Sequence, residues 1–162
     1  MIIIIIADKK IFLSLYSYNR TIKFKQMLSK TSKYAIKSLI HLASHSDENN
    51  KLSTKILAEQ TGIPSPFLSK ILQQLSSRDY VSATKGPNGG FYLTPDQRSN
   101  SVYEIITAVE GRDIYSRCVL DLTQCDAQNP CSLHSFITDS MNALKANFKE
   151  VSLSNVAQRG QL

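Results

Sequence analysis

The segment 53–75 constrains the fold more than any other part of this 162-residue chain. Ser53 is a good N-cap for a short helix, with Ile56, Leu57 and Ala58 expected on its inner side. Gly62 can adopt the left-handed conformation that ends this helix, and Pro64 suits the first turn of the next one. The second helix runs through Phe67, Leu68, Ile71, Leu72 and Leu75. Two short helices joined by a glycine-containing turn predict a helix-turn-helix.

The outward face of the second helix is polar and small. In a DNA-binding helix-turn-helix this helix enters the major groove, where hydroxyl, amide and ammonium groups reach base edges and phosphates. An ordinary helical hairpin with no DNA partner would have the same pattern, and that alternative stays open. The expected outward residues are Ser65, Pro66, Ser69, Lys70 and Gln73. The residues predicted to contact DNA from this motif are Ser53, Ser65, Pro66, Phe67, Ser69 and Lys70.

A β-hairpin is expected directly after these helices. The segments 80–84 and 91–94 are rich in aromatic and β-branched residues, which favour strands. A hairpin after a helix-turn-helix is a wing, and a flat glycine-rich tip brings backbone close to a phosphate or the minor groove. A loop that holds a nucleotide phosphate is the alternative, but it lacks the Lys-Ser/Thr that should follow. The tip residues predicted to contact DNA are Lys85, Gly86, Pro87, Asn88 and Gly89.

All three cysteines of the chain fall within a short segment that ends in a histidine. The spacing of Cys118, Cys125, Cys131 and His134 is C-x6-C-x5-C-x2-H. Thiolates and imidazole are ligands for iron–sulfur clusters and for zinc. Structural zinc sites usually have narrower cysteine gaps, so the wide spacing favours a cluster, with zinc still open. A disulfide with one odd thiol, or buried structural thiols, are the non-metal alternatives.

Charge and composition limit the classes of function. The formal net charge of +6 favours a polyanionic partner, although a merely soluble surface gives the same value. No run approaches the roughly 18 apolar residues of a membrane span, and the N-terminus lacks the pattern of a signal peptide. We therefore expect a soluble, cytoplasmic protein with no membrane partner. No nucleophile and base are paired in the sequence, so we expect no enzyme activity.

The C-terminal part predicts a long helix with one apolar seam. Its apolar residues recur at intervals of four and three, which is the spacing of a short coiled coil. Packing within one chain would explain so short a seam equally well. A reader of palindromic DNA needs a two-fold partner, however, so we expect a homodimer. The predicted interface residues are Ile137, Met141, Leu144, Phe148 and Val151.

Together these patterns predict a mainly α fold with a small β-hairpin wing: a winged helix-turn-helix plus a long C-terminal dimerisation helix. Residues 1–26 read as an N-terminal extension, either a dispensable arm or an over-extended start, and 27–98 as the DNA-binding domain. Its first helix begins at Thr31, with Ala35, Leu39, Leu42 and Ala43 on one buried face. Residues 99–157 hold a linking helix (99–111), the ligand loop (118–134) and the dimer helix, and 158–162 form a tail.

From about residue 27 to 156 the chain resembles the Rrf-two (BadM-type) family of bacterial winged-helix regulators. The matching stretches are 32–35 (SKYA), 62–68 (GIPSPFL), 85–91 (KGPNGGF), 109–111 (VEG) and the three cysteines. The resemblance implies a homodimer on a pseudo-palindromic promoter site, with affinity set by an iron–sulfur cluster that responds to redox state, nitric oxide or iron–sulfur supply. It implies a 2Fe–2S cluster with His134 as fourth ligand; 4Fe–4S and zinc are the alternatives.

The chain departs from the family pattern in two places. The first cysteine gap is six residues, one more than in the iron–sulfur members, and Ser69 stands where an acidic residue is frequent. The target DNA sequence is therefore not carried over from the family. Two further functions stay open on the sequence: a zinc-stabilised DNA-binding regulator without redox sensing, and a small iron–sulfur electron-transfer protein.

Overall fold

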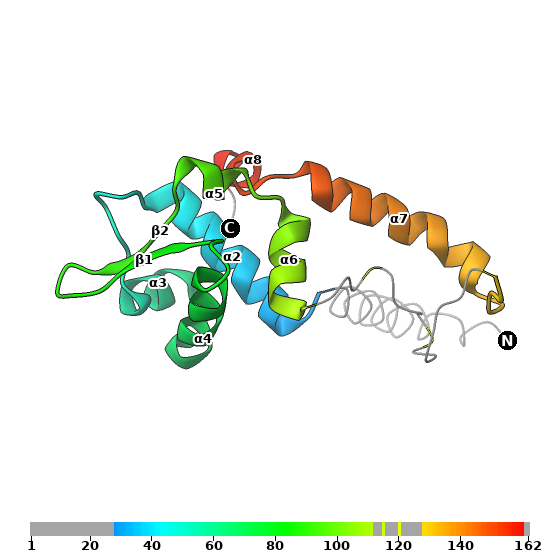
Figure 1. Cartoon of the computed structure of the whole chain (residues 1–162), viewed down its shortest axis with the longest axis horizontal. Helices are drawn as coiled ribbons and strands as arrows, with labels where there is room; N and C mark the ends of the chain where they lie inside the picture. Colours follow the sequence, from blue (N-terminus) through cyan, green and yellow to red (C-terminus); the bar gives the residue numbers. More distant parts are fainter. Residues whose placement is uncertain (1–27, 112–114, 116–119, 121–127, 161–162) are drawn as a thin grey trace, which may run out of the picture. The chain divides into compact units, whose positions relative to one another are not determined.

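The computed structural model describes residues 28–111, 115, 120 and 128–160, and the chain divides into the units Met1–Lys30 and Thr31–Leu162. The described part is mainly helical with one two-stranded antiparallel hairpin, as the sequence predicted (Figure 1). No helix in that part combines the length and the apolar character required of a membrane span. The elements are α2 (Lys30–His45), α3 (Thr54–Thr61), α4 (Ser65–Ser76), β1 (Ser82–Thr84), β2 (Gly90–Tyr92), α5 (Pro95–Ser99), α6 (Val102–Glu110), α7 (His134–Glu150) and α8 (Leu153–Gln158).

The local signals in the segment 53–75 produce the two expected helices. The Ser53 hydroxyl accepts a hydrogen bond from the Ile56 amide at 3.3 Å, which caps α3. Gly62 ends α3 at φ 68°, and its amide donates to the Ala58 carbonyl at 2.9 Å. Pro64 is the N-cap of α4 rather than a residue of its first turn, and Pro66 takes the first-turn position instead. The turn between α3 and α4 is thus fixed by residues next to it in the sequence.

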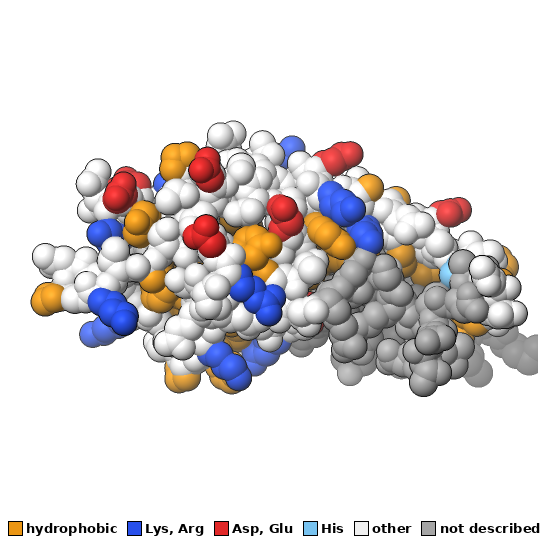
Figure 2. All heavy atoms as spheres, in the orientation of Figure 1, with side chains coloured by type: hydrophobic (Ala, Val, Ile, Leu, Met, Phe, Trp, Pro, Cys, Tyr) orange, Lys and Arg blue, Asp and Glu red, His pale blue; other side chains and the backbone are white. Residues whose placement is uncertain are grey.

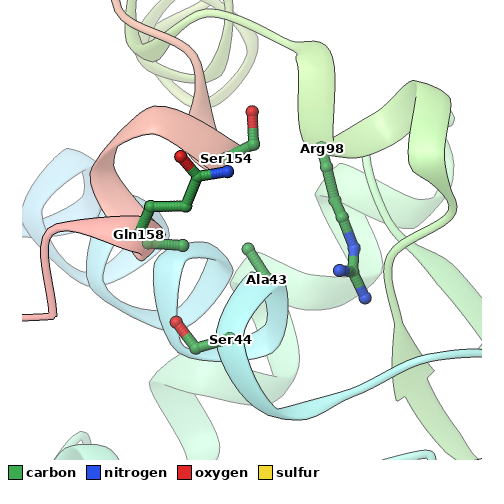
Figure 3. A pocket seen from close by; sticks show the side chains of 6 residues that line it. Ala43, Ser44, Arg98, Ser154 and Gln158 are labelled. Atoms are coloured by element: carbon green, nitrogen blue, oxygen red, sulfur yellow. The ribbon is translucent and has the colours of Figure 1, made fainter.

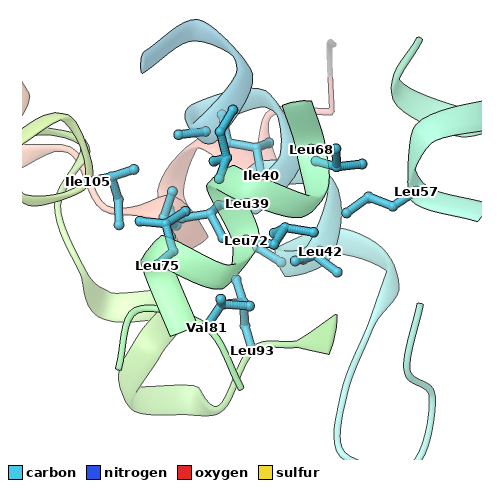
Figure 4. Packing of buried hydrophobic residues seen from close by; sticks show 14 of the residues in the cluster. Leu39, Ile40, Leu42, Leu57, Leu68, Leu72, Leu75, Val81, Leu93 and Ile105 are labelled. Carbon is cyan, nitrogen blue, oxygen red and sulfur yellow. The ribbon is translucent and has the colours of Figure 1, made fainter. Parts of the chain in front are cut away.

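The core holds α2, α3 and α4 together with the wing. Ala35, Leu39, Leu42 and Ala43 are buried along one face of α2, as their spacing predicted. Figure 4 shows this face packed against leucines of α3 and α4. Full burial of each leucine contributes about 1.5–3 kcal/mol. The largest fully buried side chains are Leu39, Leu42, Leu57, Ile63, Leu68, Leu72, Leu75, Val81, Leu93, Ile105, Ile106 and Leu153.

The wing is shorter than the predicted strands and rests on a third segment. Ser82 pairs with Tyr92 and Thr84 with Gly90. Tyr80 does not join the strand, because its amide bonds to the Leu75 carbonyl at the end of α4. Leu52 forms an isolated bridge with Phe91, through two backbone hydrogen bonds of 3.0 and 2.9 Å. The base of the wing is therefore fixed to the residues that precede α3.

The predicted helix 99–111 corresponds to α6, and the separate short helix α5, which the sequence did not predict, ends at Ser99 before it. Ser101 caps α6, and Glu104 returns a hydrogen bond to the Ser101 amide in a capping box. The α6 helix ends at Gly111, at φ 72°. After α7 the chain returns to this region, since the Val102 amide donates to the Val151 carbonyl at 2.8 Å. The short helix α8, which the sequence did not predict, then buries Leu153 in the core.

Candidate nucleic-acid interface and metal ligands

The exposed face of α4 matches the predicted outward residues closely. Ser65, Pro66, Lys70 and Gln73 are exposed, and Ser69 is half-buried. The side chain of Phe67 is 56% exposed, although its apolar type favours the core. Leu68 next to it is fully buried, so the helix turns its polar residues and Phe67 outward together. Such a face can hydrogen-bond to base edges and pack an aromatic ring on a thymine methyl group.

The exposed residues of α3 differ in part from the prediction. Leu57 is buried and Ala58 half-buried as expected, but Ile56 is 42% exposed and is not an inner residue. A helix of eight residues presents only one narrow stripe to α4, and Ile56 lies outside it. The half-buried Ser53 places its hydroxyl in the cap of α3, which fixes that side chain at the start of the helix-turn-helix.

The tip of the wing is exposed and held by backbone. Lys85, Gly86, Pro87 and Asn88 are exposed, and the Gly89 amide closes the turn on the Gly86 carbonyl at 2.9 Å. A Cβ at Gly89 would lie 2.4 Å from the Thr84 carbonyl oxygen. The turn therefore requires glycine there, and it presents Lys85 on a tight, narrow tip.

The helix-turn-helix and wing carry an excess of positive charge. Residues 51–92 contain five Lys and Arg and two acidic residues, a net +3. Figure 2 shows Lys and Arg side chains along the edge that holds α3, α4 and the wing. Positive charge beside a helix of groove-reading size favours nucleic-acid phosphates as ligands. The cations are Lys51, Lys55, Lys70, Arg78 and Lys85.

Two of the four predicted metal ligands lie in the described part of the chain. Cys118 and Cys125 lie outside the described residues, which contain no group of three or more potential ligands. Cys131 has a free thiol and is half-buried, as is His134, the first residue of α7. The His134 amide donates to the Cys131 carbonyl at 3.0 Å, so a single turn joins the two residues. A free thiol and an imidazole one turn apart have the chemistry of a cluster or zinc ligand pair.

The helix α7 has no buried side chain in the single chain. Ile137, Met141, Leu144, Phe148 and Val151, the predicted interface residues, are all half-buried, whereas Phe136 is 78% exposed. The Nζ atoms of Lys145 and Lys149 lie 5.5 and 5.2 Å from the centre of the Tyr103 ring of α6. An amphipathic helix whose apolar residues are only half-buried in their own chain has apolar surface available to a further partner.

A hydrogen-bonded contact between α4 and α6 was not evident from the sequence. The Gln74 side-chain amide donates to the carbonyls of Ala108 and Val109 at 3.1 and 3.2 Å, and the Arg78 guanidinium also donates to Ala108. The acceptors lie at least 30 residues away along the chain, so no local pattern marks them.

A small open pocket of about 230 Å³ lies among α2, α5 and α8 (Figure 3). Arg98 lines it, but its guanidinium is already bonded to the Ser46 and Leu93 carbonyls. Ser44, Ser154 and Gln158 supply the other polar groups. Its lining includes none of the residues predicted to contact DNA or metal.

Comparison with known proteins identifies the family. The model of the Rrf2 family, described as an iron-dependent transcriptional regulator, matches residues 28–159. The transcriptional repressor NsrR of Streptomyces coelicolor is 31% identical over 106 residues, 65% of this chain and 67% of that protein. Two solved structures share the fold at 19% identity. CymR, the global cysteine regulator of B. subtilis, has a TM-score of 0.69 over 83% of this chain and 98% of its own. T. potens IscR has a TM-score of 0.66 over 86% and 91%.

The family match spans most of the chain and contains the helix-turn-helix, the wing, and all three cysteines. It confirms the resemblance and the winged-helix fold inferred from the sequence. The matched family model and these relatives are described as regulators, and NsrR as a transcriptional repressor. This protein therefore belongs to the Rrf2 family of DNA-binding transcriptional regulators.

Proposed function

We propose that this Rrf2-family regulator binds a pseudo-palindromic promoter site as a homodimer, and that an iron–sulfur cluster sets its affinity for that site. The observation that carries the DNA part is the joint exposure of the α4 face and the wing tip on a positively charged surface. The family description as iron-dependent supports the cluster part, together with the three cysteines and His134.

On DNA, the two exposed elements have different tasks. The α4 helix enters the major groove, where Ser65 and Ser69 reach base edges and Phe67 contacts a thymine methyl group. Lys70 and Lys85 contact phosphates, which gives affinity without sequence preference. The wing tip approaches the neighbouring minor groove, since Gly86 and Gly89 allow the backbone to come close.

A second copy of the chain is needed to complete the DNA-binding unit. A pseudo-palindromic site has two half-sites about one helical turn apart, so two α4 helices must be held at that spacing. The apolar residues Met141, Leu144 and Phe148 recur along α7 at heptad intervals, and all three are only half-buried in their own chain. In the proposed dimer these stripes pack against each other.

Cys118, Cys125, Cys131 and His134 are the proposed ligands of a 2Fe–2S cluster. Cys131 and His134 precede and open α7, so their backbone is positioned by the first turn of that helix. An imidazole ligand in place of a thiolate raises the reduction potential of such a cluster. The bound cluster would supply a redox-active group that oxidants, nitric oxide or iron–sulfur shortage can alter.

Protein purified without air tests the metal part of the proposal directly. We expect iron and sulfide at two each per chain, visible charge-transfer absorption, and an electron-paramagnetic signal after reduction. One zinc per chain with no visible absorption would instead support the zinc-stabilised regulator without redox sensing. Either result is independent of DNA.

A DNA-binding assay with cluster-loaded and cluster-free protein tests the regulatory part. We expect binding to a promoter fragment to differ between the two forms by about 5- to 150-fold, the usual range for coupled sites. Equal binding by both forms would overturn the regulatory role of the cluster. No binding to DNA by either form would favour a small electron-transfer protein.

A further inference from the structure

The C-terminal half of α4 is hydrogen-bonded to the C-terminal end of α6. Gln74 is half-buried and donates two hydrogen bonds, of 3.1 Å to Ala108 and 3.2 Å to Val109. Arg78, two residues beyond α4, donates a third bond to Ala108. The last carbonyls of a helix have no intrahelical partner, so these side chains satisfy acceptors that would otherwise need another donor. The groove-reading helix is thus joined to α6 by directional bonds as well as apolar contact.

The α6 helix in turn leads directly into the segment that carries the proposed ligands. Gly111 ends α6, and Cys118 follows it by seven positions in the sequence. Between them, Tyr115 is only 6% exposed. Its ring centre lies 6.2 Å from that of Tyr103 in α6 and 5.7 Å from that of Phe148 in α7. Tyr115, which precedes the ligand loop in the sequence, is therefore packed on both α6 and α7.

The C-terminal end of α6 is also hydrogen-bonded to α2. The Ser32 hydroxyl, in the first turn of α2, donates to the Glu110 carboxylate at the end of α6. The C-terminal end of α6 thus contacts both α2 and α4, whereas Tyr115 packs on Tyr103 in the first turn of the same helix. A small movement of that C-terminal end changes the bonds to α4 directly, because hydrogen bonds weaken steeply with distance and angle.

We infer that Gln74 and Arg78 are positioning residues that couple the metal-ligand segment to the groove-reading helix. This inference rests on the proposed function. Apolar packing is non-directional, whereas a hydrogen bond depends on both distance and angle. The hydrogen bonds of Gln74 and Arg78 make the position of α4 depend on the Ala108 and Val109 carbonyls. A coupling route requires evidence of energetic coupling, and a ratio of affinities supplies it.

The test compares cluster-loaded and cluster-free forms of the full chain carrying Gln74→Ala and Arg78→Ala together. The measurement is the ratio of the two dissociation constants for one promoter fragment. For the unsubstituted protein we expect a ratio of about 5 to 150. For the double variant we expect a ratio within about twofold of one, with unchanged iron content, because the ligands are intact. A double variant that keeps the full ratio would overturn the inference.

Two further variants separate coupling from a general loss of structure. Arg98→Ala removes an arginine that also donates to two backbone carbonyls, those of Ser46 and Leu93, but in α5. We expect Arg98→Ala to keep the full ratio of the two dissociation constants. If it lost as much of that ratio as the double variant does, the specific role of Gln74 and Arg78 would be overturned. Gln74→Glu replaces the hydrogen-bond donor by an acceptor of the same shape. If the double variant does not fold, this variant still tests whether the hydrogen bonds from Gln74 to α6 are needed for the ratio. Retention of the full ratio by folded Gln74→Glu would likewise count against the inference.

Failure of the proposed function is distinguishable from failure of this inference. A ratio of one in the unsubstituted protein means that the cluster does not regulate binding at all. A full ratio in the unsubstituted protein, kept in the double variant, means that regulation exists but reaches α4 by another route. Thermal unfolding of each variant confirms that the compared proteins are folded.

Discussion

Gly90 lies at the base of the wing, where the backbone of Leu52 leaves no room for a side chain. A Cβ at Gly90 would lie 2.8 Å from the Leu52 carbonyl carbon and oxygen. We predict that Gly90→Ala destabilises the domain by about 1–3 kcal/mol, the usual effect of overpacking a filled site. Denaturant unfolding followed by circular dichroism measures this difference.

Asn88→Ala is the control for that substitution, because Asn88 is exposed at the wing tip. Surface changes of this kind are usually within about 0.5 kcal/mol of neutral. If Gly90→Ala unfolded at the same denaturant concentration as Asn88→Ala, the contact of Leu52 with the wing would not limit residue size at position 90.

Lys85 and the serines of α4 are predicted to affect DNA binding in different ways. Lys85→Ala should weaken binding to all sequences and reduce the slope of log affinity against log salt by about one. Ser65→Ala and Ser69→Ala should change the preference among sequences instead. Fluorescence anisotropy with promoter and random DNA at several salt concentrations measures both effects.

Arg159→Ala is the matched control for charge, since Arg159 is exposed beyond α8 and is not part of the helix-turn-helix or the wing. We expect a smaller change in the salt slope than for Lys85→Ala. Equal effects of Lys85→Ala, Ser65→Ala and Ser69→Ala on promoter and random DNA would contradict the division between phosphate contacts and base contacts.

At the scale of the elements, the sequence predicted best where the cause of the structure is local. Ser53, Gly62 and Gly111 each end or cap a helix through bonds to residues next to them, so their types alone mark the boundaries. The wing turn is equally local, because its glycines are required by the turn itself.

The elements that the sequence missed are short and depend on distant contacts. The α5 helix has five residues and α8 has six, too few for helical periodicity to be recognised. Leu153 of α8 is buried by residues of other elements, and Gln97 of α5 donates to the Asp79 carbonyl. The exposure of Ile56 is likewise a tertiary result, because its residue type favours burial.

In the candidate site, too, the features that depend on local sequence were predicted and those that depend on distant contacts were not. Exposure of the α4 face followed from helical spacing, whereas the bonds of Gln74 and Arg78 to α6 did not. The contribution of Cys118 and Cys125 to the metal centre remains a prediction from the cysteine spacing, since both lie outside the described residues. Spacing identifies ligand types, but it does not fix their arrangement around a metal.

The first turn of α7 gives a prediction about the metal centre. His134 opens α7 and lies one turn from Cys131. Replacement of an imidazole ligand by a thiolate adds negative charge to the cluster, so His134→Cys should lower its reduction potential by on the order of 100 mV. Redox titration followed by electron-paramagnetic resonance measures the shift.

Ser135→Cys is the control, because it adds a thiol at the neighbouring exposed position of α7. We expect its cluster to keep the potential of the unsubstituted protein. An unchanged potential in His134→Cys would show that His134 is not a ligand of the cluster.

At the scale of the whole molecule, the described part of Thr31–Leu162 brings distant parts of the chain together. The Ser101–Ser152 bridge and the bonds of Val102 and Leu153 join the start of α6 to the end of α7. Both ends of the ligand segment therefore connect to helices that are bonded to each other. Any change in α7 packing is expected to reach α6 and, through Gln74 and Arg78, the α4 helix.

The two-fold partner is tested by a charge placed in the apolar seam of α7. Leu144 is half-buried in the single chain, and the proposed partner copy covers it. Leu144→Glu keeps helix propensity but requires a carboxylate to enter that seam, so we predict monomers. A monomer engages one half-site at a time, and its affinity for the full promoter site should fall by about 100-fold or more. Analytical ultracentrifugation and anisotropy measure the two effects, with Asn142→Glu on the exposed side of α7 as the matched control. A dimeric Leu144→Glu protein with full affinity would place the partner surface elsewhere, because an unpaired carboxylate is not tolerated in a tightly packed helix seam.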